Sequence, residues 1–201
     1  MRAEEPLLGV PDHAGDPVGT SRWATVPNFL TLIRLLLVPV LAVLLLAEDG
    51  LDPALRWAAT AVFVLAALTD LADGEIARRS GTVTTVGKIA DPVADKALTG
   101  VALIGLSLLG DLPWWVTIVI LAREIGVTAL RFVVIRHGVI PASRGGKAKT
   151  VAQVVAIALY LAPLEAWADP VRVIAMAIAL VLTVVTGIDY AVRAWRLTKA
   201  A

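Results

Sequence analysis

The chain has no cysteine among its 201 residues and only two histidines. Disulfide bonds and thiolate metal sites are therefore excluded. Charged residues are also scarce, at 17%, whereas hydrophobic residues make up 58%. The mean hydropathy is +0.81, and the apolar residues form long runs instead of the alternating or amphipathic patterns of a soluble core. This composition is typical of an integral membrane protein and leaves no room for a large soluble domain.

The first 25 residues differ from the rest of the chain, because they carry proline, glycine and acidic residues. They lack the basic segment followed by an apolar segment that marks a signal peptide. We expect residues 1–25 to form a disordered tail and residues 26–197 to form one membrane domain.

Six apolar runs follow this tail, and each suits a helix that crosses a bilayer with about 20 residues. Turn-forming residues connect the runs, so neighbouring helices should be antiparallel. The sequence predicts an all-α integral membrane protein with a bundle of six transmembrane helices. The expected helical segments are 29–47, 54–79, 86–109, 113–137, 149–166 and 171–193.

The distribution of lysine and arginine predicts the orientation of the bundle. The connections after the second and fourth segments and the C-terminus are basic, whereas the alternate connections are mainly acidic. The positive-inside rule places both termini and the basic connections in the cytoplasm, so we expect a protein of the cell (inner or plasma) membrane. The tryptophans fall at segment ends, as in an aromatic belt, although a core position is the alternative. They are Trp57, Trp114, Trp115 and Trp167 at outer ends, and Trp23 and Trp195 at inner ends.

One polar stretch, TDLADGEIARRSGTVTTVGKIADPVADKAL at residues 69–98, interrupts the apolar chain with four aspartates. On a helix, residues three or four positions apart share a face. Asp70 and Asp73 therefore form one stripe on the second helix, and Asp91 and Asp95 form another on the third. Two antiparallel neighbours bring these stripes together near the cytoplasmic edge of the membrane.

Four carboxylates in a partly desolvated cleft repel one another unless cations neutralise them. Oxygen ligands without a nearby histidine or cysteine favour Mg²⁺ or Mn²⁺, and four carboxylates are enough for two ions. Gly74 and Ala77 share the aspartate face and leave a hollow for a flat group. Arg78 lies where it would pair with a phosphate at the mouth of that hollow. The sequence thus predicts a site for two divalent ions, a flat ligand and phosphate.

These residues resemble the signature of the CDP-alcohol phosphotransferases, which reads D-x2-D-G-x2-A-R-x8-G-x3-D-x3-D. The resemblance implies a six-helix bundle, usually a homodimer, that transfers a phosphatidyl or related group from a CDP-linked donor to an alcohol and releases CMP. The sequence meets every specified position, with Asp70, Asp73, Gly74, Ala77, Arg78, Gly87, Asp91 and Asp95.

The resemblance also implies a role for each residue of the signature. The four aspartates are expected to bind two Mg²⁺ or Mn²⁺ ions, with Asp95 acting as the catalytic base as well. Gly74 and Ala77 would make room for the cytidine of the donor, and Arg78 would hold its diphosphate. Asp70 is also expected to contact the donor.

Four flanking stretches resemble those family members that make phosphatidylglycerophosphate: VPNFLTLIRLLLVPV, DPVADKAL, LAREIGVTALR and SRGGKAKTVAQ. This resemblance implies CDP-diacylglycerol as donor and sn-glycerol 3-phosphate as acceptor. Phosphatidylglycerol, as in a cardiolipin synthase, and inositol phosphate are alternative acceptors. A small ion-coupled transporter is an alternative of another class, which the clustering of the carboxylates at one membrane face disfavours. No nucleic-acid partner is expected.

A doubly charged acceptor requires cations near the metal ions. Arg123 and Glu124 lie deep in an apolar helix, where an ion pair explains them as well as a substrate role does. Lys147 and Lys149 flank a GGK turn just before the fifth helix, and their alternative role is to set the topology. The candidates for binding the acceptor phosphate are Arg34, Arg123, Arg144, Lys147 and Lys149.

Asn28, Thr31 and Arg34 recur every three residues and share one face of the first helix. Asn28 follows Pro27 and is also suited to cap this helix. A polar stripe that runs into the bilayer nevertheless indicates contact with the nucleotide or metal cleft. We therefore expect Asn28 and Thr31 to contact the CDP donor.

Overall fold

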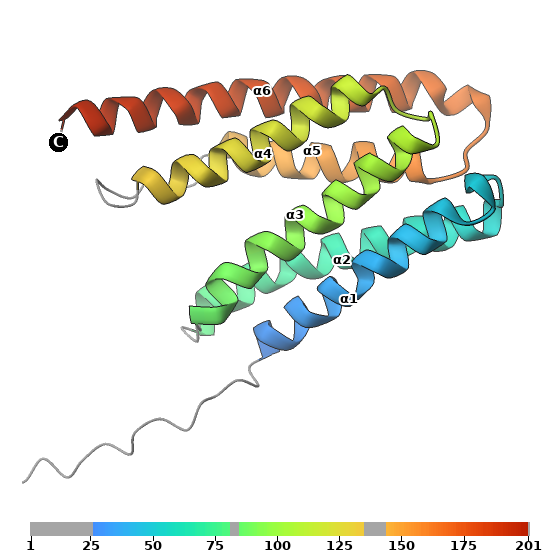
Figure 1. Ribbon diagram of the computed structural model, residues 1–201, viewed down its shortest axis with the longest axis horizontal. Coiled ribbons are helices and arrows are strands. Elements are labelled where there is room, and N and C mark those ends of the chain that lie inside the picture. The colour runs from blue at the N-terminus through green and yellow to red at the C-terminus, as the bar shows by residue number, and fades with distance from the viewer. Residues whose placement is uncertain (1–25, 81–84, 135–143, 201) are drawn as a thin grey trace, which may run out of the picture.

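A computed structural model describes the backbone of residues 26–80, 85–134 and 144–200, and the side chains of residues 32–69, 96–134 and 145–199. Over these ranges the fold is all-α, as predicted, and six α-helices pack into an elongated bundle (Figure 1). They are α1 (Val26–Leu46), α2 (Pro53–Ser80), α3 (Thr85–Leu108), α4 (Trp114–Val134), α5 (Arg144–Leu161) and α6 (Asp169–Ala200), with short 3₁₀ helices η1 (Ala47–Gly50) and η2 (Ala166–Ala168). The tail expected over residues 1–25 lies outside the described residues.

The six helices correspond to the six predicted segments, but three boundaries differ by five or more residues. α5 ends at Leu161, five residues before the predicted end. α5 begins at Arg144, so the prediction that Lys147 and Lys149 precede the helix is wrong. Glycine is tolerated in a first turn, where side chains contribute little packing, and Gly145 and Gly146 therefore do not delay the helix. α6 continues to Ala200, seven residues beyond the predicted end, because its basic C-terminal residues form helix well and suit a helix C-terminus.

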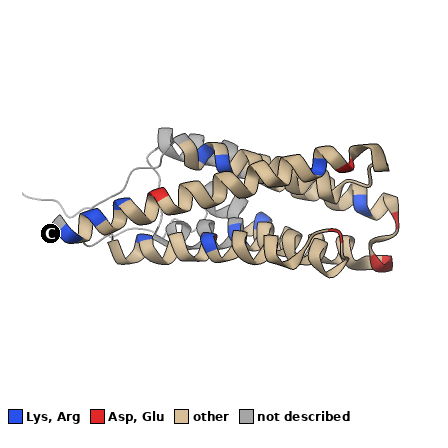
Figure 2. Ribbon diagram, turned by 90° about the horizontal axis from the view of Figure 1, so that it is seen from above, with Lys and Arg blue, Asp and Glu red and all other residues tan. Residues whose placement is uncertain are grey.

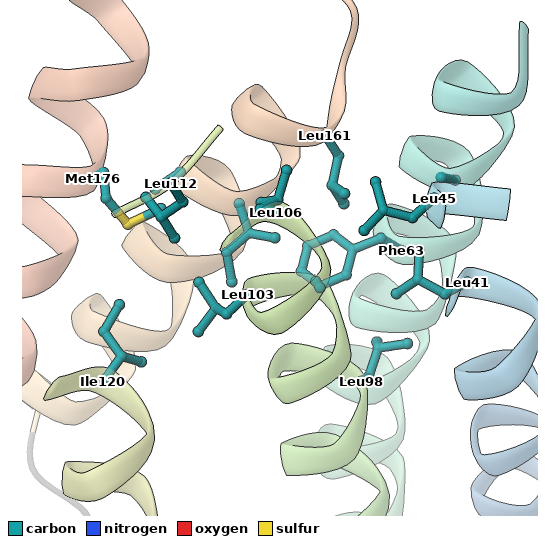
Figure 3. Close-up of a cluster of buried hydrophobic side chains, with 14 of the residues drawn as sticks. Leu41, Leu45, Phe63, Leu98, Leu103, Leu106, Leu112, Ile120, Leu161 and Met176 are labelled. Atoms are coloured by element: carbon teal, nitrogen blue, oxygen red, sulfur yellow. The ribbon is translucent and has the colours of Figure 1, made fainter. Parts of the chain in front are cut away.

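The helices pack in two groups. α1 packs mainly against α2 and α3, and α6 packs mainly against α4 and α5. Contacts of α2 with α5, and of α3 with α4 and α5, join the groups. Where the groups meet, buried leucines surround Phe63 (Figure 3). The core residues labelled there are Leu41, Leu45, Phe63, Leu98, Leu103, Leu106, Leu112, Ile120, Leu161 and Met176.

The outer surface of the bundle is also apolar. Many large hydrophobic side chains are exposed, and α6 alone exposes valines and isoleucines along most of its length. Among the described residues, one continuous apolar helix, Ala166–Lys199, has the length and composition to cross a bilayer. A surface of this kind is favourable against lipid and unfavourable against water.

The five described tryptophans that the sequence placed at helix ends are all exposed, so their alternative role in the core is wrong. Trp57, Trp114, Trp115 and Trp167 lie near one end of the bundle, and Trp195 lies near the other. This arrangement agrees with two aromatic belts at membrane interfaces.

We call the end of the bundle formed by residues 47–52, 109–113 and 162–169 the acidic end, because it carries most of the acidic residues whose side chains the structure describes (Figure 2). Its turns are short and well capped. Asp52 caps α2 by accepting hydrogen bonds from the backbone N–H groups of Ala54 at 2.7 Å and Leu55 at 3.2 Å. Gly110, with φ +81°, adopts the left-handed conformation that ends α3.

Candidate active site

The aspartates of the signature lie at matched levels of two neighbouring helices. Asp70 lies ten residues before the end of α2 at Ser80, and Asp95 lies ten residues after the start of α3 at Thr85. The helical rise places both about 15 Å from the connection that joins the two helices. Asp73 and Asp91 lie between these levels and the connection.

This backbone arrangement fits a pair of divalent ions. The helices contact each other and continue through all four aspartates, so each pair keeps the spacing of three or four residues that puts it on one face. A purely carboxylate set suits Mg²⁺ or Mn²⁺ better than softer metals. The following predicted site side chains lie outside the described residues: Asn28, Thr31, Asp70, Asp73, Gly74, Ala77, Arg78, Asp91, Asp95 and Arg144.

A buried charged cluster joins α4 to α5 and α6. Glu124 Oε1 accepts hydrogen bonds from Lys149 Nζ at 2.7 Å and from Arg123 Nη1 at 3.0 Å. The side chains of Glu124 and Lys149 are only 15% and 7% exposed. The ion pair expected for Arg123 and Glu124 is therefore present, and Lys149 shares the same carboxylate oxygen. We call Arg123, Glu124 and Lys149 the Glu124 cluster.

The Glu124 cluster carries more positive than negative charge among its described members. Two cations share one carboxylate, and Lys96 of α3 adds a further positive charge that acts on Glu124. Lys96 directly follows Asp95, the predicted base. Cations gathered at one place in an apolar bundle can donate hydrogen bonds to an anionic ligand.

Two other acceptor candidates differ in their surroundings. Arg34 of α1 is buried, with 3% exposure. It belongs to the group of α1, α2 and α3, whereas Arg123 belongs to the group of α4, α5 and α6. Lys147 is exposed near the start of α5, two residues before the buried Lys149. Residues two positions apart on a helix point in different directions. Lys147 therefore does not share the helix face through which Lys149 joins the Glu124 cluster.

Sequence reasoning missed two polar groups beside this cluster. Gln153 lies one turn after Lys149 in α5, is 5% exposed, and its Nε2 has no hydrogen-bond partner among the described residues. Thr186 of α6 accepts a hydrogen bond from Arg123 Nη2 at 2.9 Å. A glutamine in an apolar helix gave a signal that could have been noticed, whereas a threonine in such a helix did not.

The acidic end holds a second set of paired charged residues that the sequence did not reveal. Arg56 donates to the carbonyl oxygens of Tyr160 and Leu161, and Arg172 donates to that of Leu159. Both guanidinium groups thereby cap the C-terminus of α5, whose last carbonyl groups have no partners within the helix. They also pair with aspartates beside a cavity of about 290 Å³ that Arg56, Asp111, Tyr160, Asp169, Arg172 and Val173 line. This set stabilises the acidic end, because it joins α2 and α6 to the C-terminus of α5.

Comparison with known protein families shows the family to which the chain belongs. The model of the family described as CDP-alcohol phosphatidyltransferase matches residues 24–185, which cover α1 to α5 and about half of α6. The chain belongs to this family. The matched range includes the four aspartates and the Glu124 cluster, so both lie in the part of the chain that CDP-alcohol phosphatidyltransferases share.

Individual members of the CDP-alcohol phosphatidyltransferase family are similar over most of the chain. A probable phosphatidylglycerophosphate synthase of Mycobacterium tuberculosis is 53% identical over 184 residues, 92% of this chain and 88% of the relative. A CDP-diacylglycerol–glycerol-3-phosphate 3-phosphatidyltransferase of Bacillus subtilis is 37% identical over 87% of this chain and 97% of the relative. An enzyme of the same name from Rickettsia typhi is 36% identical over 82% and 93%.

Proposed function

We propose that the protein is a phosphatidylglycerophosphate synthase, which transfers the phosphatidyl group of CDP-diacylglycerol to sn-glycerol 3-phosphate and releases CMP. The observation that carries this proposal is the complete aspartate signature in a chain 53% identical over 92% of its length to a protein named for that activity. The Glu124 cluster supports the choice of acceptor, because Arg123 and Lys149 are cations that can donate to the dianionic phosphate of glycerol 3-phosphate.

The reaction is a displacement at the β-phosphorus of the donor. Asp95 accepts the proton of the acceptor's 1-hydroxyl group. The oxygen of that hydroxyl group forms the new bond to the β-phosphorus, and the bond between this phosphorus and the oxygen of CMP breaks, so that CMP leaves. Arg78 pairs with the diphosphate, while Arg123 and Lys149 hold the acceptor phosphate. Asp70, Asp73, Asp91 and Asp95 would hold two Mg²⁺ or Mn²⁺ ions, which would neutralise the charge of the diphosphate.

We propose that the reaction takes place in the cell membrane and that the enzyme is a homodimer. The six helices span the bilayer with the aspartates near the cytoplasmic face, which follows from the basic connections beside them. The donor keeps its acyl chains in the bilayer and enters the site laterally between helices.

Replacing the proposed base tests the mechanism. Asp95→Asn keeps the size of the side chain but cannot take the proton, so we expect Mg²⁺-dependent CMP release from CDP-diacylglycerol to fall by roughly 10²–10⁴-fold. Asp189→Asn is the matched control, because Asp189 lies on α6 in a half-exposed pair with Arg193 and should leave the rate unchanged. Full activity of Asp95→Asn would show that the base is another group.

Acceptor competition tests the substrate. Purified protein is given labelled CDP-diacylglycerol with equal concentrations of glycerol 3-phosphate, phosphatidylglycerol and inositol phosphate, and the lipid products are separated. We expect phosphatidylglycerophosphate to dominate. Predominant cardiolipin or phosphatidylinositol phosphate would assign another acceptor, and flux of an ion across sealed vesicles without CMP release would assign a transporter.

A further inference from the structure

The guanidinium of Arg123 is held from two sides by different helices. Its Nη1 donates to Glu124 Oε1 at 3.0 Å, and its Nη2 donates to Thr186 Oγ1 at 2.9 Å. The hydroxyl proton of Thr186 is directed to the carbonyl oxygen of Leu182 at 2.7 Å. The lone pairs of Oγ1 are therefore left to accept from Arg123, and the rotation of the guanidinium is defined.

The next residue of α6, Gly187, determines where the stem of Arg123 runs. A Cβ atom at Gly187 would lie 2.9 Å from Arg123 Cγ and 3.3 Å from Arg123 Nε. The first distance is shorter than carbon atoms tolerate, and Cγ is close to the backbone, so the side chain could not swing aside easily. Arg123 crosses α6 along this path because residue 187 has no side chain.

Arg123 nevertheless retains an unused donor. Its Nε is buried and has no hydrogen-bond partner among the described residues. Buried N–H groups without an acceptor are rare in proteins, and the explanations for one are a ligand, a water, an ion or local strain. Because the neighbouring Glu124 and Lys149 form the cluster proposed to bind phosphate, an oxygen of the acceptor phosphate is suited to this donor.

We propose that Thr186 and Gly187 of α6 are positioning residues for the acceptor phosphate, because together they hold the Arg123 guanidinium beside Glu124 and Lys149. This inference rests on the proposed function. It extends the acceptor site to the sixth helix, beyond the aspartates of α2 and α3. Neither residue carries a charge, and neither is assigned contact with the substrate.

Two substitutions test the proposal by different routes. Gly187→Ala displaces the stem of Arg123 without changing any charge, and Thr186→Val removes the acceptor of Nη2 while keeping the size of the side chain. For both we expect the KM for glycerol 3-phosphate to rise about tenfold, the fold-change of a weakened hydrogen bond to a charged group. The KM for CDP-diacylglycerol should stay within about twofold, since the donor's contacts remain.

Matched variants separate positioning from general destabilisation. Gly126→Ala adds the same methyl group to α4 at a position where nothing lies within 4 Å of the new Cβ, so it should leave both KM values unchanged. Thr186→Ser keeps the hydroxyl group and should restore the KM for glycerol 3-phosphate. Unchanged KM values in both Gly187→Ala and Thr186→Val would overturn the proposal, as would an equal rise for donor and acceptor.

The outcome is distinguishable from a failure of the proposed function. If the wild-type protein released CMP with another acceptor and not with glycerol 3-phosphate, the proposed function would be wrong before any variant was measured. The same variants would then be compared on that acceptor, where an acceptor-selective change in KM supports the positioning role and its absence refutes it.

Discussion

The lysine at position 149 differs from its neighbour at position 147 in a way that only packing determines. Both were equal candidates in the sequence, because both are cations beside a glycine pair. In the structure Lys149 is buried against Glu124, whereas Lys147 is exposed. The sequence predicted that Arg123 and Glu124 could pair, since they are adjacent, but the third member depends on how α5 packs against α4.

Lys149→Met should therefore raise the KM for glycerol 3-phosphate by roughly 10- to 100-fold, the effect of losing a hydrogen bond between charged groups. Glu124 keeps its bond to Arg123, so the loss falls mainly on the acceptor. Steady-state kinetics with varied acceptor at saturating donor measure the change. Lys147→Met is the control and should alter the KM by less than about twofold. Equal effects of the two substitutions would contradict the assignment of Lys149.

At the scale of the helix, periodicity and turn formers predicted which segments are helical, because an apolar run of about 20 residues has few other stable forms in a membrane. The ends were less predictable. α5 starts at Arg144 despite its glycine pair, since the energy of a first turn comes from its neighbours and caps as well as from propensity. The residues that cap the C-terminus of α5 are Arg56 of α2 and Arg172 of α6, and no local sequence pattern in α5 predicts them.

Removal of one of these caps should destabilise the whole bundle. Arg172 donates to the carbonyl oxygens of Leu159, Ala162 and Leu164, so Arg172→Met leaves them without this partner. We expect the free energy of unfolding in mixed micelles to fall by about 3 kcal/mol, from several lost hydrogen bonds near the bilayer interface.

Arg193→Met is the matched control on the same helix. Arg193 pairs with Asp189 across one turn, and both side chains are about half exposed. This loss should be below about 0.5 kcal/mol. If both substitutions had similar small effects, the arginine caps would contribute little to stability.

At the scale of the whole molecule, the topology remains a prediction that the missing cysteines make easy to test. Any single introduced cysteine is the only thiol of the chain. Glu165 lies exposed at the acidic end, and Lys147 lies exposed near the start of α5. In intact cells a membrane-impermeant maleimide should label Glu165→Cys, and it should label Lys147→Cys only after permeabilisation. The reverse pattern would invert the predicted orientation.

The arginine caps also bear on the order in which the chain matures. Arg56 lies on the second helix, but its carbonyl partners lie 104 and 105 residues later, in the fifth. During synthesis α2 reaches the membrane well before α5 has been made. Until then the guanidinium of Arg56 lacks its carbonyl partners and lies in the aqueous interface. The α2–α3 hairpin with its aspartates is thus inserted before α5, and the acidic end closes only when α5 arrives. A nascent chain stopped before α5 would carry the whole signature and still lack the carbonyl partners of Arg56.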